Sequence, residues 1–446
     1  MSAVDRNNLW DAPVAPSRPL AASLEIPGSK SIMARALILA ALASSPTTIT
    51  RPLISRDSEL MRDGLRAMGV KIEESPTSWR VTPERSEHRG EPRNIDVGNA
   101  GTVMRFLPPV AALSDGIFHF DGDARSHDRP LAPVIKALES LGVRIEHQGR
   151  YALPMTIYGS GQLEGGEIEI DASLSSQFVS SLLLAAPAMK NGLLIKDIGA
   201  NVPSMPHIEM TIAMLQEQDV TVTSGVTDGS SQRWWKVSPR TSRGVEAQIE
   251  IEPDLSNAAP FLAAALLVGG KVAIKNWPRA TTQPGDSLRR IFTQMGGNFT
   301  RNGDDLVIEA SGDRSDIKGI DIDLSGEGEL TPTIATLAAF ASTPSHLRGI
   351  GHLRLHETDR LTALATELRK VGATVVEGAD DLTITPATTL PSGPITISTY
   401  DDHRIATLGA LVGLMIPGTK VENIATTRKT ITDFPKLWSE LLSLEI

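Results

Sequence analysis

The sequence has 446 residues, no cysteine and a formal net charge of −10 at pH 7. Without cysteine, the chain has no disulfide, no thiolate metal ligand and no cysteine nucleophile. The negative charge and the aromatic content of only 4% argue against a nucleic-acid partner. No apolar run reaches the length of a membrane span, and residues 1–20 lack the apolar core of a signal peptide. We therefore expect a cytoplasmic globular protein of two or more domains.

Six similar units follow one another in chain order. Each opens with a short polar cluster, continues as an apolar helix rich in alanine and leucine, and then forms a strand, a second helix and two further strands. The polar openings are residues 28–31, 98–102, 173–177, 253–257, 326–330 and 401–404. The apolar helices are expected at 34–43, 106–113, 179–188, 258–267, 334–341 and 405–414. The strands after them are expected at 47–50, 117–120, 193–198, 271–274, 346–347 and 420–421. Because helices that are apolar on every side must be buried, the sequence predicts an α/β repeat fold.

The clearest break in composition is a polar stretch at residues 232–248, after the third unit. We therefore divide the chain into two lobes of three units each, residues 31–247 and residues 1–30 with 248–446. If the units are equivalent, the N-termini of three buried helices meet on one face of each lobe. Helix N-termini attract anions, so this arrangement predicts a polyanionic small molecule bound in a cleft between the lobes.

The first three openings are rich in hydrogen-bond donors. Residues 27–35 place Lys30, Ser31 and Arg35 at the start of a buried helix, which is typical of a phosphate site. A capped helix with two solvated cations would give the same pattern. The same two alternatives hold for the donors of the second and third units, Asn99, Gly101, Arg125, Ser175, Ser176 and Gln177.

The densest charged cluster lies at residues 353–360. Glu357 stands between His356 and Arg360, which suits a proton-transfer group, although Glu357 and Arg360 would equally form an ordinary surface pair. Similar places in the fifth and sixth units are occupied by Glu329, Arg404 and Lys429. This agreement in position favours a functional role for the set. The histidine spacing fits no metal site and no glycine-rich nucleotide motif is present, so we expect neither a metal nor a cofactor.

Together these motifs resemble the EPSP synthases (3-phosphoshikimate 1-carboxyvinyltransferases), a family of enolpyruvyl transferases. The resemblance rests on residues 27–31 with Arg35, 98–102 with Arg105, 175–178, 356–361 and 402–404. It implies a two-lobed inside-out α/β barrel built from six repeated βαβαββ units, three per lobe. It also implies transfer of the enolpyruvyl group of phosphoenolpyruvate to the 5-hydroxyl of shikimate 3-phosphate, through a tetrahedral intermediate and with loss of phosphate. This step of the shikimate pathway to chorismate and the aromatic amino acids needs no cofactor, and the family is the target of the herbicide glyphosate.

The resemblance also implies roles for individual residues. Glu329 takes the hydroxyl proton, Glu357 protonates and then deprotonates the methylene carbon, and Lys30 assists the departing phosphate. Shikimate 3-phosphate is bound by Lys30, Ser31, Arg35, Ser175, Ser176, Gln177, Ser204, His207, Glu329, His352 and His356. Phosphoenolpyruvate is bound in the inter-lobe cleft by Lys30, Asn99, Gly101, Arg125, Gln177, Arg360, Arg404 and Lys429. The first lobe then supplies mainly the shikimate 3-phosphate side, and we expect a monomer with these two molecules as its partners.

Three histidines depart from the usual family pattern. His207, His352 and His356 stand where many members have tyrosine, asparagine and lysine. Because histidine titrates near neutral pH, the affinity for shikimate 3-phosphate is expected to vary between about pH 6 and 7.5.

Two alternative functions remain open at this point. An enolpyruvyl transferase acting on UDP-N-acetylglucosamine usually has Lys-Asn where this chain has Lys30-Ser31, and it commonly uses a loop cysteine, which is absent here. A repeat protein that binds ligands without catalysis would not need Glu329, Glu357 and Lys429.

Overall fold

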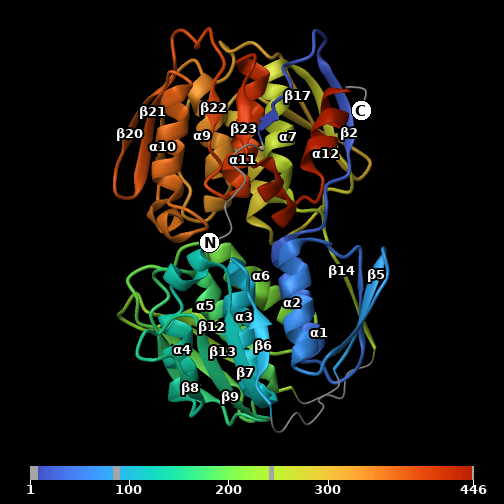
Figure 1. Cartoon of the computed structure of the whole chain (residues 1–446), viewed down its shortest axis with the longest axis vertical. Coiled ribbons are helices and arrows are strands. Elements are labelled where there is room, and N and C mark those ends of the chain that lie inside the picture. The colour runs from blue at the N-terminus through green and yellow to red at the C-terminus, as the bar shows by residue number, and fades with distance from the viewer. Residues whose placement is uncertain (1–8, 84–90, 241–245, 444–446) are drawn as a thin grey trace. The chain divides into compact units, whose positions relative to one another are not determined.

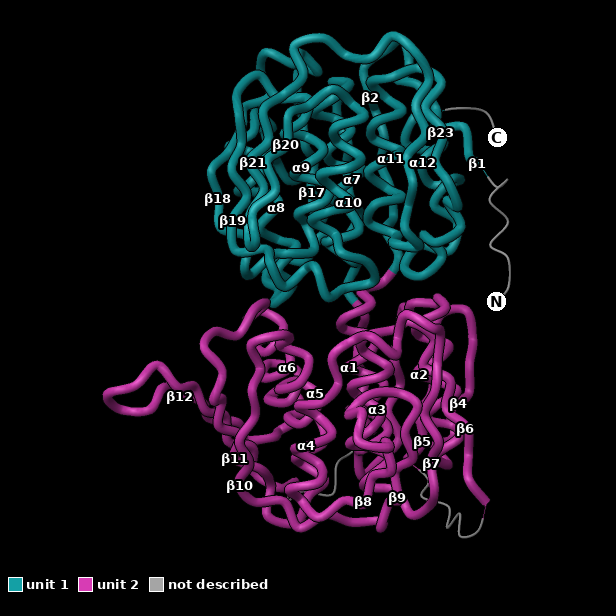
Figure 2. The backbone as a smooth tube through the Cα atoms, turned by 60° about the vertical axis from the view of Figure 1, so that its left-hand side comes forward, with its two compact units in different colours: residues 1–27, 252–446 teal, residues 28–251 magenta. Residues whose placement is uncertain are grey.

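The computed structural model describes residues 9–83, 91–240 and 246–443. These residues form two compact units, a C-terminal unit of residues 1–27 with 252–446 and an N-terminal unit of residues 28–251 (Figure 2). Each unit has a hydrophobic core of its own. The boundaries differ slightly from those expected, because residues 28–30 and 248–251 belong to the N-terminal unit. Within the described ranges, no helix is both long enough and apolar enough to cross a membrane.

The described part of the N-terminal unit contains three four-stranded sheets. Their strand orders are β14-β3-β5-β4, β6-β7-β9-β8 and β10-β11-β13-β12. In each sheet the first two strands run parallel and the other pairs antiparallel. The strands are β3 (Thr47–Thr50), β4 (Lys71–Glu74), β5 (Ser78–Thr82), β6 (Arg93–Asp96), β7 (Asp115–Asp121), β8 (Arg144–Glu146), β9 (Met155–Ser160), β10 (Gly166–Ile170), β11 (Leu193–Asp197), β12 (Val222–Val226), β13 (Arg233–Val237) and β14 (Ala247–Glu250).

Three apolar helices fill the centre of this unit. They are α1 (Lys30–Ala41), α3 (Gly101–Leu113) and α5 (Ser176–Ala185), and they pack against one another. All residues of α3 are buried, as the absence of a polar face predicts. The remaining helices are α2 (Arg56–Ala67), η1 (Ala124–Asp128), α4 (Ala132–Ser140), η2 (Ala186–Ala188) and α6 (Met205–Gln216).

The C-terminal unit repeats this plan. Helices α7 (Leu255–Val268), α9 (Thr331–Phe340) and α11 (His403–Met415) pack together at its centre (Figure 1). The other helices are η3 (Pro284–Ser287), α8 (Leu288–Gln294), η4 (Gly328–Leu330), η5 (Gly351–Leu355), α10 (Arg360–Lys370), η6 (Ile424–Lys429) and α12 (Phe434–Leu442). The strands are β1 (Leu9–Asp11), β2 (Leu20–Leu24), β15 (Gly270–Ile274), β16 (Asn298–Asn302), β17 (Asp305–Ala310), β18 (Asp321–Asp323), β19 (Ser345–Arg348), β20 (Thr374–Glu377), β21 (Asp381–Thr385), β22 (Thr396–Ile397) and β23 (Lys420–Glu422).

The first strands of the first and fourth repeats are exchanged. Strand β2 precedes α1 in sequence, but it pairs in parallel with β15 of the fourth repeat. Strand β14 precedes α7, but it pairs in parallel with β3 of the first repeat. This exchange explains why residues 248–251 belong to the N-terminal unit, contrary to the boundary expected from the sequence.

The sixth repeat is incomplete, so the expectation of six full units is wrong at this point. Its sheet has the order β1-β23-β22, and β1 from the start of the chain takes an edge position by antiparallel pairing with β23. Helix α12 is its second helix, since it follows η6 as α10 follows η5, but no strand follows α12 among the described residues, and Trp438 and Phe434 bury their rings in the core. The N-terminal strand therefore completes the last sheet.

The elements expected from the sequence are confirmed in type, with shifted ends. Strand β3 covers the expected residues 47–50, and β7 and β15 extend beyond their expected ends. The buried helices begin two to five residues earlier than expected, five of them inside the polar openings and α9 directly after its opening. Helix α1 begins at Lys30 because the Ser29 side chain caps it, accepting a bond from the backbone N–H of Ile32. The polar openings are therefore the first turns of the buried helices.

Candidate active site

The N-termini of the three central helices converge within the C-terminal unit. Arg404, in the first turn of α11, donates a hydrogen bond of 2.9 Å to the carbonyl of Ser256 in the first turn of α7. The Nε atom of Arg404 lies 3.2 Å from a carboxylate oxygen of Glu329, in η4 just before α9. Because Arg404 contacts both of the other helix starts, the convergence expected from the repeat is confirmed in this unit.

Arg360 is the centre of the charged cluster. It opens α10 and only 1% of its side chain is exposed. Its guanidinium donates to Asp402 at 2.7 Å, to Glu329 at 3.1 Å, and to Glu357. Burial lowers the pKa of Arg360, but these three carboxylates outweigh burial and raise it. Burial raises the pKa of Asp402, although its bonds to Arg360 and to the backbone N–H of Arg404 oppose that rise.

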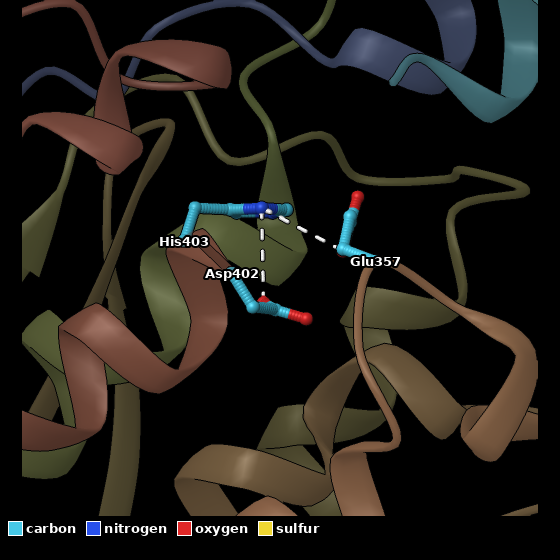
Figure 3. A group of neighbouring side chains, drawn as sticks. All are labelled: Glu357, Asp402 and His403. Atoms are coloured by element: carbon cyan, nitrogen blue, oxygen red, sulfur yellow. Dashed lines mark ion pairs between the residues drawn. The ribbon is translucent and has the colours of Figure 1, made fainter. Parts of the chain in front are cut away.

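Glu357 is enclosed by cations. Lys429, at the end of η6, donates a hydrogen bond of 2.8 Å to one carboxylate oxygen, and Arg360 binds the other. His403 Nδ1 lies 3.9 Å from Glu357 and 4.0 Å from Asp402 (Figure 3). One ligand atom from each of Glu357, Asp402 and His403 falls within 4.8 Å of the others. Both carboxylates already bind the buried Arg360, so a metal ion at this position would have to compete with that guanidinium for their oxygens.

Glu329 is the most accessible of the three carboxylates around Arg360, with 30% of its side chain exposed, against 8% for Glu357 and 0% for Asp402. Burial opposes its ionisation, but the charges of Arg360 and Arg404 prevail and hold the pKa of Glu329 well below its usual value. Glu329 is therefore ionised in the free protein and can accept a proton from a hydroxyl group.

The histidines beside Glu329 are held neutral. Burial, and then the charge of Arg360, lowers the pKa of His356 well below 6.5, and burial lowers that of His352. The geometry agrees, because Arg360 Nη1 lies 3.0 Å from His356 Nδ1 and an arginine can only donate. In the free protein, His352 and His356 therefore take up a proton only at a lower pH than an ordinary histidine does.

A second cluster lies at the start of α3 in the N-terminal unit. Arg105 donates a hydrogen bond of 2.8 Å to the Gln177 side chain, which joins the first turns of α3 and α5. Arg129 donates to the carbonyl of Asn99 at 2.6 Å. A Cβ atom on Gly101 would lie 2.6 Å from Arg129 Nη2 and 3.2 Å from both Arg105 Nη1 and Gln177 Oε1. Glycine at position 101 therefore leaves room beside two buried guanidinium groups.

Arg35 is buried, with 1% exposure, and donates hydrogen bonds to neutral groups. It donates to Thr211 Oγ1 at 2.8 Å, to the carbonyls of Ser31 and His207 at 2.9 Å each, and to Ser180 Oγ at 3.4 Å. Burial lowers the pKa of Arg35 to about 9. These bonds join α1, α5 and α6, so Arg35 fixes the backbone around Ser31 and His207.

The other expected residues of the N-terminal unit lie at helix starts or turns. Lys30 Nζ is 3.4 Å from the buried Asp57 of α2, and Ser175 caps α5. Ser204 precedes α6 in a left-handed conformation, with φ of 54°. Arg125, in η1, has 40% of its side chain exposed and pairs with Asp128 at 3.7 Å. The structure thus brings Gly101 and Gln177 together with arginines other than Arg125.

A sequence model of the EPSP synthase family (3-phosphoshikimate 1-carboxyvinyltransferase) matches residues 14–438. The chain belongs to the EPSP synthase family. Among curated relatives of this family member, the 3-phosphoshikimate 1-carboxyvinyltransferase of Kocuria rhizophila is 46% identical over 449 residues. That alignment covers 99% of this chain and 98% of the relative.

Solved structures of enolpyruvyl transferases share the fold of this EPSP synthase family member. An EPSP synthase from Acinetobacter baumannii superposes with a TM-score of 0.74 at 24% identity, covering 96% of this chain and 97% of that chain. The enolpyruvyl transferase NikO from Streptomyces tendae gives a TM-score of 0.71 at 14% identity and covers 96% of each chain. The two-lobed α/β fold expected from the sequence is thereby confirmed.

Three buried residues of the clusters were not assigned a role from the sequence. Asp402 caps α11 and binds Arg360, Arg129 lies beside Gly101, and Asp57 pairs with Lys30. Asp402 carried a signal, since it directly precedes the His403-Arg404 pair at a helix opening. Arg129 and Asp57 look like surface residues in the sequence, and only their burial distinguishes them.

Proposed function

We propose that this EPSP synthase family member transfers the enolpyruvyl group of phosphoenolpyruvate to the 5-hydroxyl of shikimate 3-phosphate and releases phosphate. The observation that carries the proposal is the position of Glu357, whose carboxylate lies between Lys429 and the buried Arg360. A carboxylate enclosed by two cations can move a proton at a carbon atom while the cations hold an anionic substrate. The 46% identity to a curated 3-phosphoshikimate 1-carboxyvinyltransferase supports the same reaction.

The two glutamates take different roles in the proposal. Glu329 is ionised and partly exposed, so it accepts the proton of the 5-hydroxyl as the oxygen attacks C2 of phosphoenolpyruvate. Glu357 takes a proton from the Lys429 ammonium group that is hydrogen-bonded to it and delivers that proton to the methylene carbon, giving a tetrahedral intermediate. When phosphate leaves, Glu357 removes a proton from the same carbon and returns it to Lys429, and the hydroxyl proton held by Glu329 passes to the phosphate. Lys30 assists the departing phosphate. The reaction requires no cofactor and no metal.

Phosphoenolpyruvate binding makes Glu329 a stronger base in this scheme. In this scheme the carboxylate of phosphoenolpyruvate binds Arg360 and Arg404, the same cations that hold the pKa of Glu329 down in the free protein. A second anion at these arginines weakens their effect on Glu329, so its pKa rises towards the range of an effective base. The protein therefore gains basicity at Glu329 when the substrate arrives.

The remaining substrate contacts follow the expected assignment with two changes. Arg35 has its donors engaged with the protein, so we assign it to positioning Ser31 and His207. Shikimate 3-phosphate is assigned to Lys30, Ser31, Ser175, Ser176, Gln177, Ser204, His207, Glu329, His352 and His356. Phosphoenolpyruvate is assigned to Lys30, Asn99, Gly101, Arg129, Gln177, Arg360, Arg404 and Lys429, with the buried Arg129 in place of the exposed Arg125. These residues come from both units, so the reaction requires both units to act on one pair of substrates.

We also propose that the protein works as a monomer in the cytoplasm. Each unit has a complete hydrophobic core, and the absence of cysteine suits a reducing compartment. Light scattering coupled to size-exclusion chromatography tests the first point, and fractionation of the producing cells tests the second.

Phosphate release from phosphoenolpyruvate tests the function directly. The purified protein is supplied with phosphoenolpyruvate and either shikimate 3-phosphate or UDP-N-acetylglucosamine. Release with shikimate 3-phosphate alone is expected. Release only with UDP-N-acetylglucosamine would assign the other enolpyruvyl transfer, and release with neither would leave a binding protein.

A further inference from the structure

A short segment delivers the side chains at the start of α11 to the charged cluster. It runs from β22 to the helix start, residues 396–402. Within it, Tyr400 and Asp401 adopt left-handed conformations with φ of 54° and 55°. Two successive non-glycine residues in this region are uncommon and cost free energy, so the surrounding structure must hold them there.

One face of α10 holds both ends of this segment. At its first residue, Arg360 binds Asp402, as described above. Two turns later Glu367 accepts hydrogen bonds from the Tyr400 hydroxyl at 2.7 Å and from the backbone N–H of Ser398 at 3.2 Å. Residues seven positions apart lie on the same helix face. Arg360 and Glu367 therefore fix Asp402 and the residues just before it.

Glu367 is fully buried, which is unusual for a carboxylate near the C-terminal end of a helix. Lys370 binds both of its oxygens, at 2.9 and 2.7 Å, and also donates to the carbonyl of Thr396 at 3.0 Å. Buried ion pairs contribute little net stability compared with apolar side chains of the same size. Stability alone thus gives no reason for a charged residue at this position, whereas a geometric role does.

We propose that Glu367 is a positioning residue for the phosphoenolpyruvate site, acting through residues 398–402 on Arg404. The inference rests on the proposed function, since it concerns the cation assigned to the substrate carboxylate. Asp402 caps α11 and accepts from the backbone N–H of Arg404 at 2.8 Å. If the segment is displaced, Asp402 moves. Its bonds to Arg360 and to the backbone N–H of Arg404 then change, and the Arg404 side chain shifts. The support for the site therefore extends two helical turns along α10.

Two variants and one matched control test this role. Glu367→Gln keeps the size of the side chain but removes its charge, and Tyr400→Phe removes one hydrogen bond only. Asp286→Asn is the control, because Asp286 is a partly buried carboxylate of the same unit that accepts hydrogen bonds from Trp277 and Arg289. For each protein we measure the melting temperature, the kinetics with both substrates, and hydrogen–deuterium exchange of peptides covering 396–404.

Glu367→Gln is expected to lower kcat/KM for phosphoenolpyruvate about 10- to 100-fold, because small displacements of a substrate-holding group have effects of this size. Binding of shikimate 3-phosphate alone changes less than about twofold, and exchange at 396–404 accelerates. Tyr400→Phe shows the same pattern with a loss of about threefold, equivalent to one hydrogen bond. The control lowers the melting temperature but leaves kcat/KM unchanged.

Two results would overturn the inference. One is normal kcat/KM for phosphoenolpyruvate in Glu367→Gln; the other is exchange at 396–404 that matches the unmodified protein. If Glu367→Gln does not fold, Tyr400→Phe decides by the same criteria. If the unmodified protein releases no phosphate, the proposed function fails, and the exchange data still decide whether Glu367 holds the segment.

Discussion

Lys429 donates a hydrogen bond of 2.8 Å to Glu357, and the two side chains are only 11% and 8% exposed. The second Glu357 oxygen binds Arg360. The carboxylate is therefore fixed in orientation before any ligand binds, and little reorganisation is needed when a proton moves. The contact also joins η6 to the loop before α10, two segments far apart in the sequence.

The first prediction concerns Glu357. Glu357→Gln retains the shape of the side chain but cannot exchange a proton, so phosphate release is expected to fall by about 10²- to 10⁴-fold. Binding of shikimate 3-phosphate, measured by calorimetry, is expected to persist. Glu309→Gln on β17 is the matched control, because Glu309 is exposed and pairs with Lys271. Turnover retained in Glu357→Gln would remove Glu357 from its assigned role.

The second prediction concerns Gly101. In Gly101→Ala the new Cβ would lie 2.6 Å from Arg129 Nη2, so this guanidinium must move. Because the clash is with the end of a flexible side chain, stability changes by less than about 1 kcal/mol. We expect KM for phosphoenolpyruvate to rise about tenfold or more, since the arginines beside the site shift.

Gly393→Ala provides the control for this substitution, because a Cβ at Gly393 meets no atom within 4 Å. Steady-state kinetics and thermal melting on both variants separate the two effects. An unchanged KM in Gly101→Ala would show that Gly101 and the moved guanidinium lie away from the phosphoenolpyruvate site.

The repeat, and the place of the N-terminal segment with the second lobe, could be predicted from the sequence, whereas the pairing of β14 with the first lobe could not. Apolar helices and the strands after them are local patterns with clear periods, so α1 and β3 were placed well. The choice of partner for β2 and β14 depends on which sheet edge each strand reaches in the folded chain. Both strands are short and precede equivalent helices, so nothing local distinguishes the two pairings. For the same reason β1 could not be assigned to the last sheet.

The site shows the same division between local and long-range information. The sequence identified Glu329, Glu357 and Arg360 because their positions agree between repeats, and the structure brings them into contact. The resemblance pointed to Arg125, whereas the arginine beside Gly101 is Arg129, four positions later. Arg129 is 6% exposed and faces Gly101, whereas the Arg125 side chain is 40% exposed. Burial of a polar side chain is a tertiary property and leaves no mark in a single sequence.

The third prediction follows from the lowered pKa of His356. The pKa of an unfolded histidine is about 6.5, and that of His356 in the folded protein lies well below this value. Between the two values the unfolded chain binds more protons, so the free energy of unfolding decreases as the pH falls through this interval. Above pH 6.5 both states are neutral and the contribution is constant.

Urea unfolding at about pH 5, 6 and 7.5 measures this dependence. His356→Asn is expected to remove part of the loss of stability on the acid side. His127→Asn serves as the control, because the side chain of His127 is 39% exposed. If the unmodified protein and His356→Asn lose stability equally between pH 6.5 and 5, His356 is not held neutral by its surroundings.

The last prediction concerns the buried cation Arg35. Its guanidinium reaches four oxygen atoms at once, on α1, α5, α6 and the start of α6. In Arg35→Lys the charge remains, but one ammonium group cannot reach all four acceptors, and the carbonyls of Ser31 and His207 lose a donor. We expect a loss of about 1–3 kcal/mol in the free energy of unfolding.

Urea unfolding of Arg35→Lys, followed by tryptophan fluorescence and circular dichroism, measures this loss. Arg144→Lys is the matched control, because Arg144 is 68% exposed and binds Glu146 at the surface; a change within about 0.5 kcal/mol is expected there. Because Arg35 fixes the backbone of Ser31 and His207, affinity for shikimate 3-phosphate should also fall in Arg35→Lys. A variant as stable as the unmodified protein, but with weaker binding, would instead place Arg35 in direct contact with the substrate.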